Sequence, residues 1–149
     1  MGQRMPAWVD EACDDYAKRL PRDFAIELTE LKPAPRGKPV AQILALEAAR
    51  IVDACGASGV SAIVALDEHG ADWSSAELAR RLGRWRDDAV GVAFVIGSAD
   101  GLDASIKRRA AATLRLSSMT LPHALARVLL FEQVYRAWSM LSGHPYHRA

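Results

Sequence analysis

The C-terminal end of the chain carries the side chains best suited to chemistry on a nucleic acid. Residues 115–149 contain four arginines against one glutamate, a local charge of +3, whereas the whole chain carries +1. The end of this segment, residues 144–148, reads HPYHR. Cationic and aromatic side chains together suit contacts to phosphates and bases, although a solvated basic tail has the same composition. His144 and His147 are a poor metal pair, because no further ligand is spaced to join them.

A long apolar helix must position this tail. Thr120 is a suitable N-cap, and Pro122 fits the first turn, where its missing N–H costs nothing. The helix is expected to run to Ser142 and to stop at Gly143, which tolerates a left-handed C′ position. Pro145 then keeps the tail out of the helix. The helix is apolar on most sides and must be buried on more than one, which fits a subunit interface and a monomer core about equally.

Length and composition indicate one domain, residues 1–149, with a substantial core, because half of the residues are hydrophobic. The small net charge does not by itself indicate a nucleic-acid binder. Cys13 and Cys55 are isolated and indicate neither a metal site nor a disulfide framework. The sequence has no signal peptide and no apolar run that would span a bilayer, so we expect a cytoplasmic protein.

Helical and strand patterns alternate along the chain. Two continuous apolar runs have strand length and fit a sheet that is buried on both faces. We therefore predict an α/β fold with a parallel sheet and helices on both faces. The loop KPAPRGKP at 32–39 is most simply a solvated connection. The predicted helices are 5–20, 40–55, 75–86 (capped by Ser75), 103–112 and the long C-terminal helix; the predicted strands are 24–31, 61–66, 90–96 and 114–116.

Ligands of parallel sheets bind at the carboxyl ends of the strands. Three loops meet this description: the turn DEHG after Leu66, the loop after Ile96, and residues 116–121. The loop GSADG at 97–101 follows a strand and precedes a helix, so its backbone can approach a ligand closely. It is not GxGxxG, so the fingerprint of a nicotinamide site is absent, and a tight strand-to-helix turn is the commoner explanation. The residues alone thus indicate an α/β binder of a small ligand.

Four segments resemble one family along almost the whole chain: RMPAWV at 4–9, VALD at 64–67, FVIGSADG at 94–101, and residues 114–148. They are similar to the bacterial 23S ribosomal RNA pseudouridine-N3 methyltransferases of the SPOUT class. The resemblance implies a SPOUT fold with a C-terminal deep trefoil knot, an exception to the rule that chains do not knot. It also implies a homodimer packed through the long helix, and methylation of N3 of a pseudouridine in 23S rRNA within the ribosome. Neither DNA nor a membrane is an expected partner.

The cofactor implied by the resemblance is S-adenosyl-L-methionine. One departure affects its loop, because Ser98 and Ala99 stand where the family usually has a Gly-Pro pair, and this alters the expected stiffness of the loop. Carried over position by position, the cofactor contacts fall on the three loops named above: Leu66, Gly97, Leu116, Ser117, Ser118, Met119, Thr120 and Leu121.

Methyl transfer from a sulfonium is an in-line displacement that depends mainly on positioning. The N3–H must also lose its proton, which a base or a nearby positive charge assists. His123 and Glu132 are further candidates, with His123 more suited to capping or packing. Two alternatives stay open: a non-catalytic RNA-binding module on the same fold, and an α/β enzyme for another nucleotide. The expected roles are phosphate or substrate-anion contact for Arg136 and Arg148, base stacking for Tyr146, and proton acceptance for His147.

The first strand of the family pattern is missing from this sequence. Family members open with a short apolar strand before the RMP motif, whereas here Met1-Gly2 stands directly upstream of it. The helix at 5–20 is then left without a strand from which to cross over. We expect that the natural protein has several more residues upstream, because Met1 stands where the family pattern has the last valine of this strand and the valine codon GTG is also a bacterial start codon. Without the strand, an uncovered sheet edge would favour aggregation.

Overall fold

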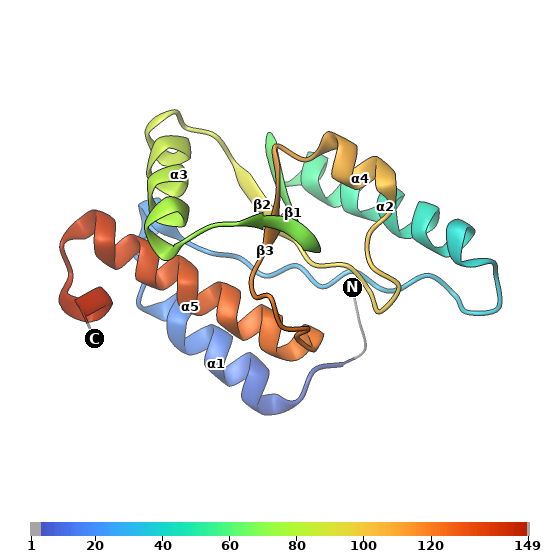
Figure 1. Cartoon of the computed structure of the whole chain (residues 1–149), viewed down its shortest axis with the longest axis horizontal. Helices are drawn as coiled ribbons and strands as arrows, with labels where there is room; N and C mark the ends of the chain where they lie inside the picture. The colour runs from blue at the N-terminus through green and yellow to red at the C-terminus, as the bar shows by residue number, and fades with distance from the viewer. Residues whose placement is uncertain (1–3, 149) are drawn as a thin grey trace.

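Three parallel strands form the sheet in the computed structural model, which describes residues 4–148 (Figure 1). They are β1 (Ala62–Asp72), β2 (Val92–Val95) and β3 (Ala112–Arg115), in the order β2-β1-β3. Ala65 pairs with Val95 on one side and with Thr113 on the other. The predicted parallel sheet is therefore confirmed for the two continuous apolar runs and for the short third strand.

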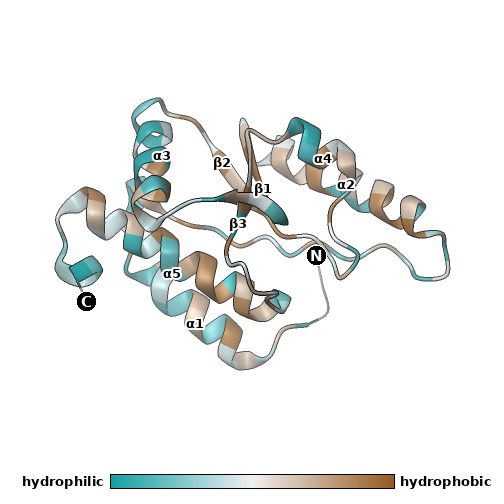
Figure 2. Ribbon diagram, in the orientation of Figure 1, coloured by the Kyte–Doolittle hydropathy of each residue, from teal (hydrophilic) through white to brown (hydrophobic). Residues whose placement is uncertain are grey.

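Helices cover both faces of the sheet, as predicted (Figure 1). On one face, α2 (Val40–Ala57) and α4 (Ala104–Arg109) share a core with Ala65 and Val95. On the other face, α3 (Ser75–Asp87) and α5 (His123–Ser142) pack against Leu66 and Phe94. The helix α1 (Ala7–Lys18) lies on α5, so α5 is buried between two layers. Successive residues of each strand thus face opposite cores, which is why these strands read as continuous apolar runs. Figure 2 shows hydrophobic residues along the inner sides of α2 and α5.

The C-terminal end of α5 is as predicted, and its start differs. Gly143 ends the helix with a left-handed φ of 74°, and residues Pro145–Arg148 form a separate 3₁₀ turn, η2. The expected N-cap at Thr120 is wrong, because the helix begins at His123 with Pro122 in the N-cap position. Pro122 has an extended ψ of 150°, so the chain turns into the helix after the proline. The cap of α3 is likewise Ser74, one residue before Ser75, and its side chain accepts a bond from the N–H of Glu77.

The predicted strand at 24–31 is wrong. Residues Arg22–Phe24 form a 3₁₀ turn, η1, and residues 25–39 have no regular secondary structure. The apolar side chains of this segment pack on helices instead, since Ile26 contacts the cores beneath α1, α3 and α5. A second difference concerns β1, which continues through the predicted DEHG turn to Asp72 with a register shift between Leu66 and Ala71.

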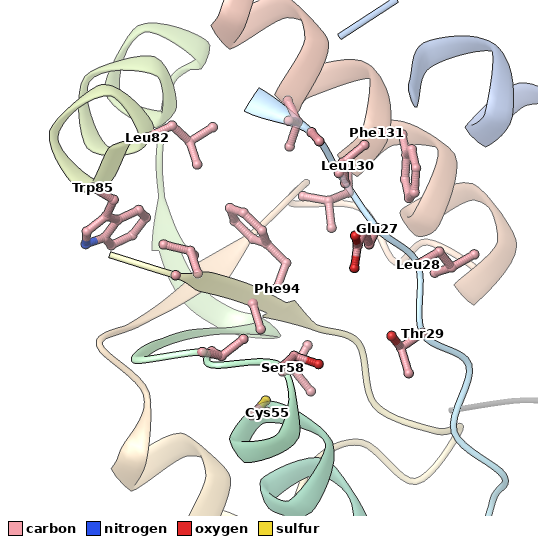
Figure 3. A pocket seen from close by; sticks show the side chains of 18 of the residues that line it. Glu27, Leu28, Thr29, Cys55, Ser58, Leu82, Trp85, Phe94, Leu130 and Phe131 are labelled. Atoms are coloured by element: carbon pink, nitrogen blue, oxygen red, sulfur yellow. The ribbon is translucent and has the colours of Figure 1, made fainter. Parts of the chain in front are cut away.

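An apolar groove separates residues 23–31 from β2 (Figure 3). Its volume is about 610 Å³, and Trp85, Phe94, Leu130 and Phe131 are among the side chains that line it. Within residues 4–148, β2 is an edge strand, because only β1 pairs with it. The expected strand upstream of the RMP motif lies outside the described residues. Within those residues, no helix is both long and apolar enough to cross a membrane.

Candidate functional site

The three loops selected from the sequence leave the sheet at one edge. Ala65 lies level with Val95 and Thr113 in the two ladders, and Leu66 lies level with Leu114. The residues that follow these strands therefore start from the same edge of the sheet. They are the bulge after Leu66, the glycine loop at 97–101 and the loop at 116–121, which are the three segments assigned to the cofactor.

The glycine loop is a tight turn that admits no side chain at its start. The N–H of Gly101 donates to the carbonyl of Ser98 over 2.9 Å, and Gly101 has a φ of 87°. A Cβ added to Gly97 would lie 2.4 Å from the Gly101 carbonyl oxygen, closer than any real contact. Glycine at 97 is therefore a requirement of the turn itself.

His123 joins the glycine loop to the start of α5. Its Nδ1 lies 3.2 Å from the carbonyl oxygen of Gly97. Burial lowers the pKa of His123 below its usual value, which favours the neutral imidazole. A carbonyl oxygen only accepts, so Nδ1 carries the proton in this bond. His123 thus packs at the start of α5, as expected, and its hydrogen bond ties the helix to the glycine loop.

The loop at 116–121 is anchored at its start and exposed at its tip. Leu116 packs against the core beneath α3 and α5. Ser117 Oγ accepts a bond of 2.9 Å from the N–H of Met119, while the Met119 side chain is 77% exposed. The loop is therefore fixed at Leu116 and by the Ser117–Met119 turn, while the Met119 side chain lies in solvent.

Glu47 is a site residue that the sequence reasoning missed. Its carboxyl group is buried, accepting a 3.1 Å bond from the N–H of Ala34 and a 2.9 Å bond from the hydroxyl of Ser98. Ser98 is one of the two departures from the family pattern, and here its hydroxyl tethers the glycine loop to α2. The signal was a glutamate at the same helical spacing as Ile43 and Ile51, on the apolar face of α2.

An ion pair also ties the end of β1 to α4. Lys107 Nζ lies 2.5 Å from the carboxylate of Asp67. The pKa of Asp67 is held below its usual value, mainly by the hydrogen bond from the backbone N–H of His69 and next by the hydrogen bond from Lys107. The bulge after Leu66 therefore has a fixed negative charge at its base.

A second cluster forms around Glu132 in the middle of α5, where the C-terminal tail packs back against the helix. Arg136 donates two bonds to Glu132 Oε1, at 2.9 and 2.7 Å, from one helical turn further along α5. The hydroxyl of Tyr146 donates to the same oxygen over 3.2 Å. The Arg136 guanidinium also lies 5.2 Å from the centre of the Tyr146 ring. Burial, followed by the hydrogen bond with Tyr16, raises the pKa of Tyr146, so its hydroxyl stays protonated at neutral pH.

His147 joins this cluster and Arg148 does not. His147 Nδ1 lies 3.2 Å from the hydroxyl of Ser139, a fully buried residue of α5. Arg148 is exposed and makes no bond or ion pair within residues 4–148. Three of the four predicted catalytic residues, Arg136, Tyr146 and His147, thus lie together. Their side chains contact Glu132, Ser139, Tyr16 and Tyr135.

The two groups of residues lie at opposite ends of α5 (Figure 1). Thirteen residues of helix separate His123 from Arg136, which corresponds to about 20 Å at 1.5 Å per residue. A single chain therefore does not bring the C-terminal cluster to the cofactor loops.

The side of α5 near the cofactor loops carries exposed leucines. Leu125 and Leu129 are 42% and 39% exposed, and Met119 precedes them. Phe131, by contrast, is buried against Val9 and Cys13 of α1. Among residues 4–148, no three histidine, cysteine or acidic side chains are placed to hold a metal ion.

Comparison with known proteins yields one family over the full chain. The family described as "Predicted SPOUT methyltransferase" matches residues 1–147. A protein of Bordetella avium named ribosomal RNA large subunit methyltransferase H is 53% identical over 151 residues, covering 100% of this chain and 96% of the relative. Proteins with the same name from Burkholderia multivorans and Cupriavidus metallidurans are 52% and 49% identical, with the same coverage of 100% and 96%.

Proposed function

The chain belongs to the SPOUT methyltransferase family, and from that premise we propose that it methylates ribosomal RNA of the large subunit. The substrate class in this proposal is taken from the names of the relatives, which are ribosomal RNA large subunit methyltransferases. The finer target, N3 of pseudouridine 1915 in 23S rRNA, follows from the resemblance of the C-terminal segment and is consistent with those names.

S-adenosyl-L-methionine is the proposed methyl donor, held by Leu66, Gly97 and residues 116–121. These residues fit the group, because they offer leucine side chains beside backbone N–H and C=O groups at the carboxyl edge of a parallel sheet. The side-chain-free turn at Gly97 also allows close approach of a ligand to the backbone. When bound, the cofactor supplies a methyl group on a sulfonium. A deep trefoil knot through residues 116–121 remains our proposal for how these loops are held.

The C-terminal cluster is proposed to receive the RNA. Arg136 and Arg148 offer positive charge to a phosphate or to the developing N3 anion, and Tyr146 offers a ring on which a base can stack. His147 is the proposed proton acceptor for N3–H. Since Glu132 holds Arg136 and Tyr146 through one oxygen, both side chains are already oriented before the substrate arrives.

A homodimer is proposed because one chain separates the two halves of the site. If two copies pack antiparallel through α5, the C-terminal cluster of one copy approaches the cofactor loops of the other. The exposed Leu125 and Leu129 supply apolar area for this contact. The partner copy would then contribute residues to each active site, so the monomer would bind the cofactor without transferring its methyl group.

Transfer of a labelled methyl group to ribosomes from a strain that lacks this modification tests the function. We expect labelling of large-subunit rRNA at one pseudouridine, with none in ribosomes that already carry the modification. Calorimetry of the folded protein with S-adenosyl-L-methionine distinguishes the enzyme from a non-catalytic RNA-binding module. A protein that binds RNA but gives no heat of binding with millimolar cofactor would be such a module.

A further inference from the structure

A short basic loop lies beside the glycine loop and takes no part in the assignments above. The basic strap, residues 32–39, contains Lys32, Arg36 and Lys38, and no acidic residue occurs from 31 to 46. The three side chains are exposed. Within residues 4–148, Lys32 and Lys38 form no ion pair, and Arg36 approaches only Asp100, at 3.8 Å. The strap therefore presents positive charge that its own chain leaves almost uncompensated.

The backbone of the basic strap is anchored to α2. Arg50 Nη1 donates to the carbonyl oxygens of Lys32 and Pro33, at 2.6 and 2.9 Å. Ala34 is buried, and its N–H donates to Glu47. Three prolines, at 33, 35 and 39, further restrict φ. The strap is thus a solvent-exposed connection, as expected from its composition, and its backbone is anchored to α2 at Lys32, Pro33 and Ala34.

The same anchor connects the basic strap to the cofactor loops. One oxygen of Glu47 binds the strap at Ala34 and the other binds the glycine loop at Ser98. Asp100, which faces Arg36, belongs to the same glycine loop. In Figure 1 the strap lies at the N-terminal end of α2, on the opposite side of the molecule from the C-terminal cluster.

We propose that the basic strap binds phosphates of the substrate RNA next to the methyl-donor loops, with Glu47 as the positioning residue. The inference rests on the proposed function and names a surface for its RNA partner. Cationic side chains that neutralise phosphates release counterions and gain affinity. Phosphate contacts fix the register of a nucleic acid without reading its sequence. Because the strap is ordered in advance, little backbone entropy is lost when RNA binds.

The test replaces the two unpaired lysines in the full-length protein, Lys32→Ala with Lys38→Ala. The probe is the unmodified large ribosomal subunit, and binding is measured over a salt series. Each lost phosphate contact makes the plot of log binding constant against log salt concentration shallower by about 0.7–0.9. For the two lysines we therefore expect the negative slope to become smaller in magnitude by about 1.4–1.8. The matched control, Lys18→Ala with Arg84→Ala, removes the same charge from exposed positions of α1 and α3 and should leave the slope unchanged.

The outcomes are distinguishable from failure of the proposed function. If the wild-type protein methylates ribosomes while the strap variant and the control have equal slopes, the strap is not an RNA contact. Absence of methyl transfer by the wild type would instead contradict the proposed function. Cofactor affinity should be unchanged in the strap variant, since neither lysine touches the cofactor loops.

Glu47 is tested by hydrogen exchange. We expect Glu47→Ala to speed exchange at the Ala34 N–H and to weaken RNA binding while the circular dichroism of the folded chain persists. Glu47→Gln, which retains an acceptor oxygen, should restore most of the protection. Wild-type exchange and RNA affinity in Glu47→Ala would show that the strap does not depend on this anchor.

Discussion

Replacing Gly97 by alanine tests the geometry of the glycine loop. The added Cβ would lie 2.4 Å from the carbonyl oxygen of Gly101, 2.6 Å from its carbonyl carbon and 3.0 Å from Leu102 Cγ. The first two atoms belong to the backbone, so the turn itself must open. The shift would also move the Gly97 carbonyl away from His123, 3.2 Å away in the native loop.

The expected cost is that of overpacking, about 1–3 kcal/mol. For a chain of this size each kcal/mol lowers Tm by about 2–4 °C, which thermal unfolding by circular dichroism resolves. Calorimetry should show the affinity for S-adenosyl-L-methionine reduced about tenfold, a loss of about 1.4 kcal/mol, because the displaced segment is the proposed binding loop.

Gly56→Ala is the matched control. Gly56 lies within α2 with nothing near the added Cβ, so alanine should stabilise the helix by about 1 kcal/mol. Cofactor affinity should stay at the wild-type value in this variant. The reasoning fails if Gly97→Ala unfolds at the wild-type temperature and binds the cofactor normally.

Three further outcomes follow from the described contacts. Leu125→Glu with Leu129→Glu should give folded monomers by light scattering, because both side chains are partly exposed in the single chain; a dimer that persists would place the interface elsewhere. Removing residues 145–149 should abolish methyl transfer with little change in cofactor affinity, since the tail lies at the far end of α5; equal loss of both would assign the tail to the cofactor pocket. Hydrogen bonds from two arginines lower the pKa of Glu77 from 4.5 to about 2, so their stabilisation is complete above pH 4.5 and disappears as the pH falls towards 2. Acid titration of Glu77→Gln should therefore show a smaller loss of stability across that range.

The elements governed by local chemistry were predictable. The left-handed Gly143 at the end of α5 and the two buried strands follow from residue types that act on their own neighbours. The segment 24–31 was mispredicted because apolar alternation also suits an irregular segment that packs on helices. The alternation indicates which side chains point into the core. It does not indicate whether the segment pairs with a neighbouring strand.

The sequence predicted that the three loops lie at one edge of the sheet, since parallel strands share an edge, but it did not predict the side-chain contacts. That these loops hold the cofactor stays a prediction. The tail cluster depends on Tyr16, which lies 130 residues from Tyr146 and carries no sequence signal of that contact. The interface test uses Leu125 and Leu129 and not Phe131, because Phe131 is buried against α1 and glutamate there would unfold the monomer before testing a dimer.

The contact between Tyr16 and Tyr146 also joins two segments that are made at different times during synthesis. The N-terminal helix α1 leaves the ribosome first, yet its apolar side, with Val9 and Cys13, is covered by Phe131 of α5. Tyr146 is translated 130 residues after Tyr16, so the cluster around Glu132 forms long after α1 has been made. Such long sequence separation slows folding. We therefore expect the C-terminal cluster to be among the last parts of the fold to form.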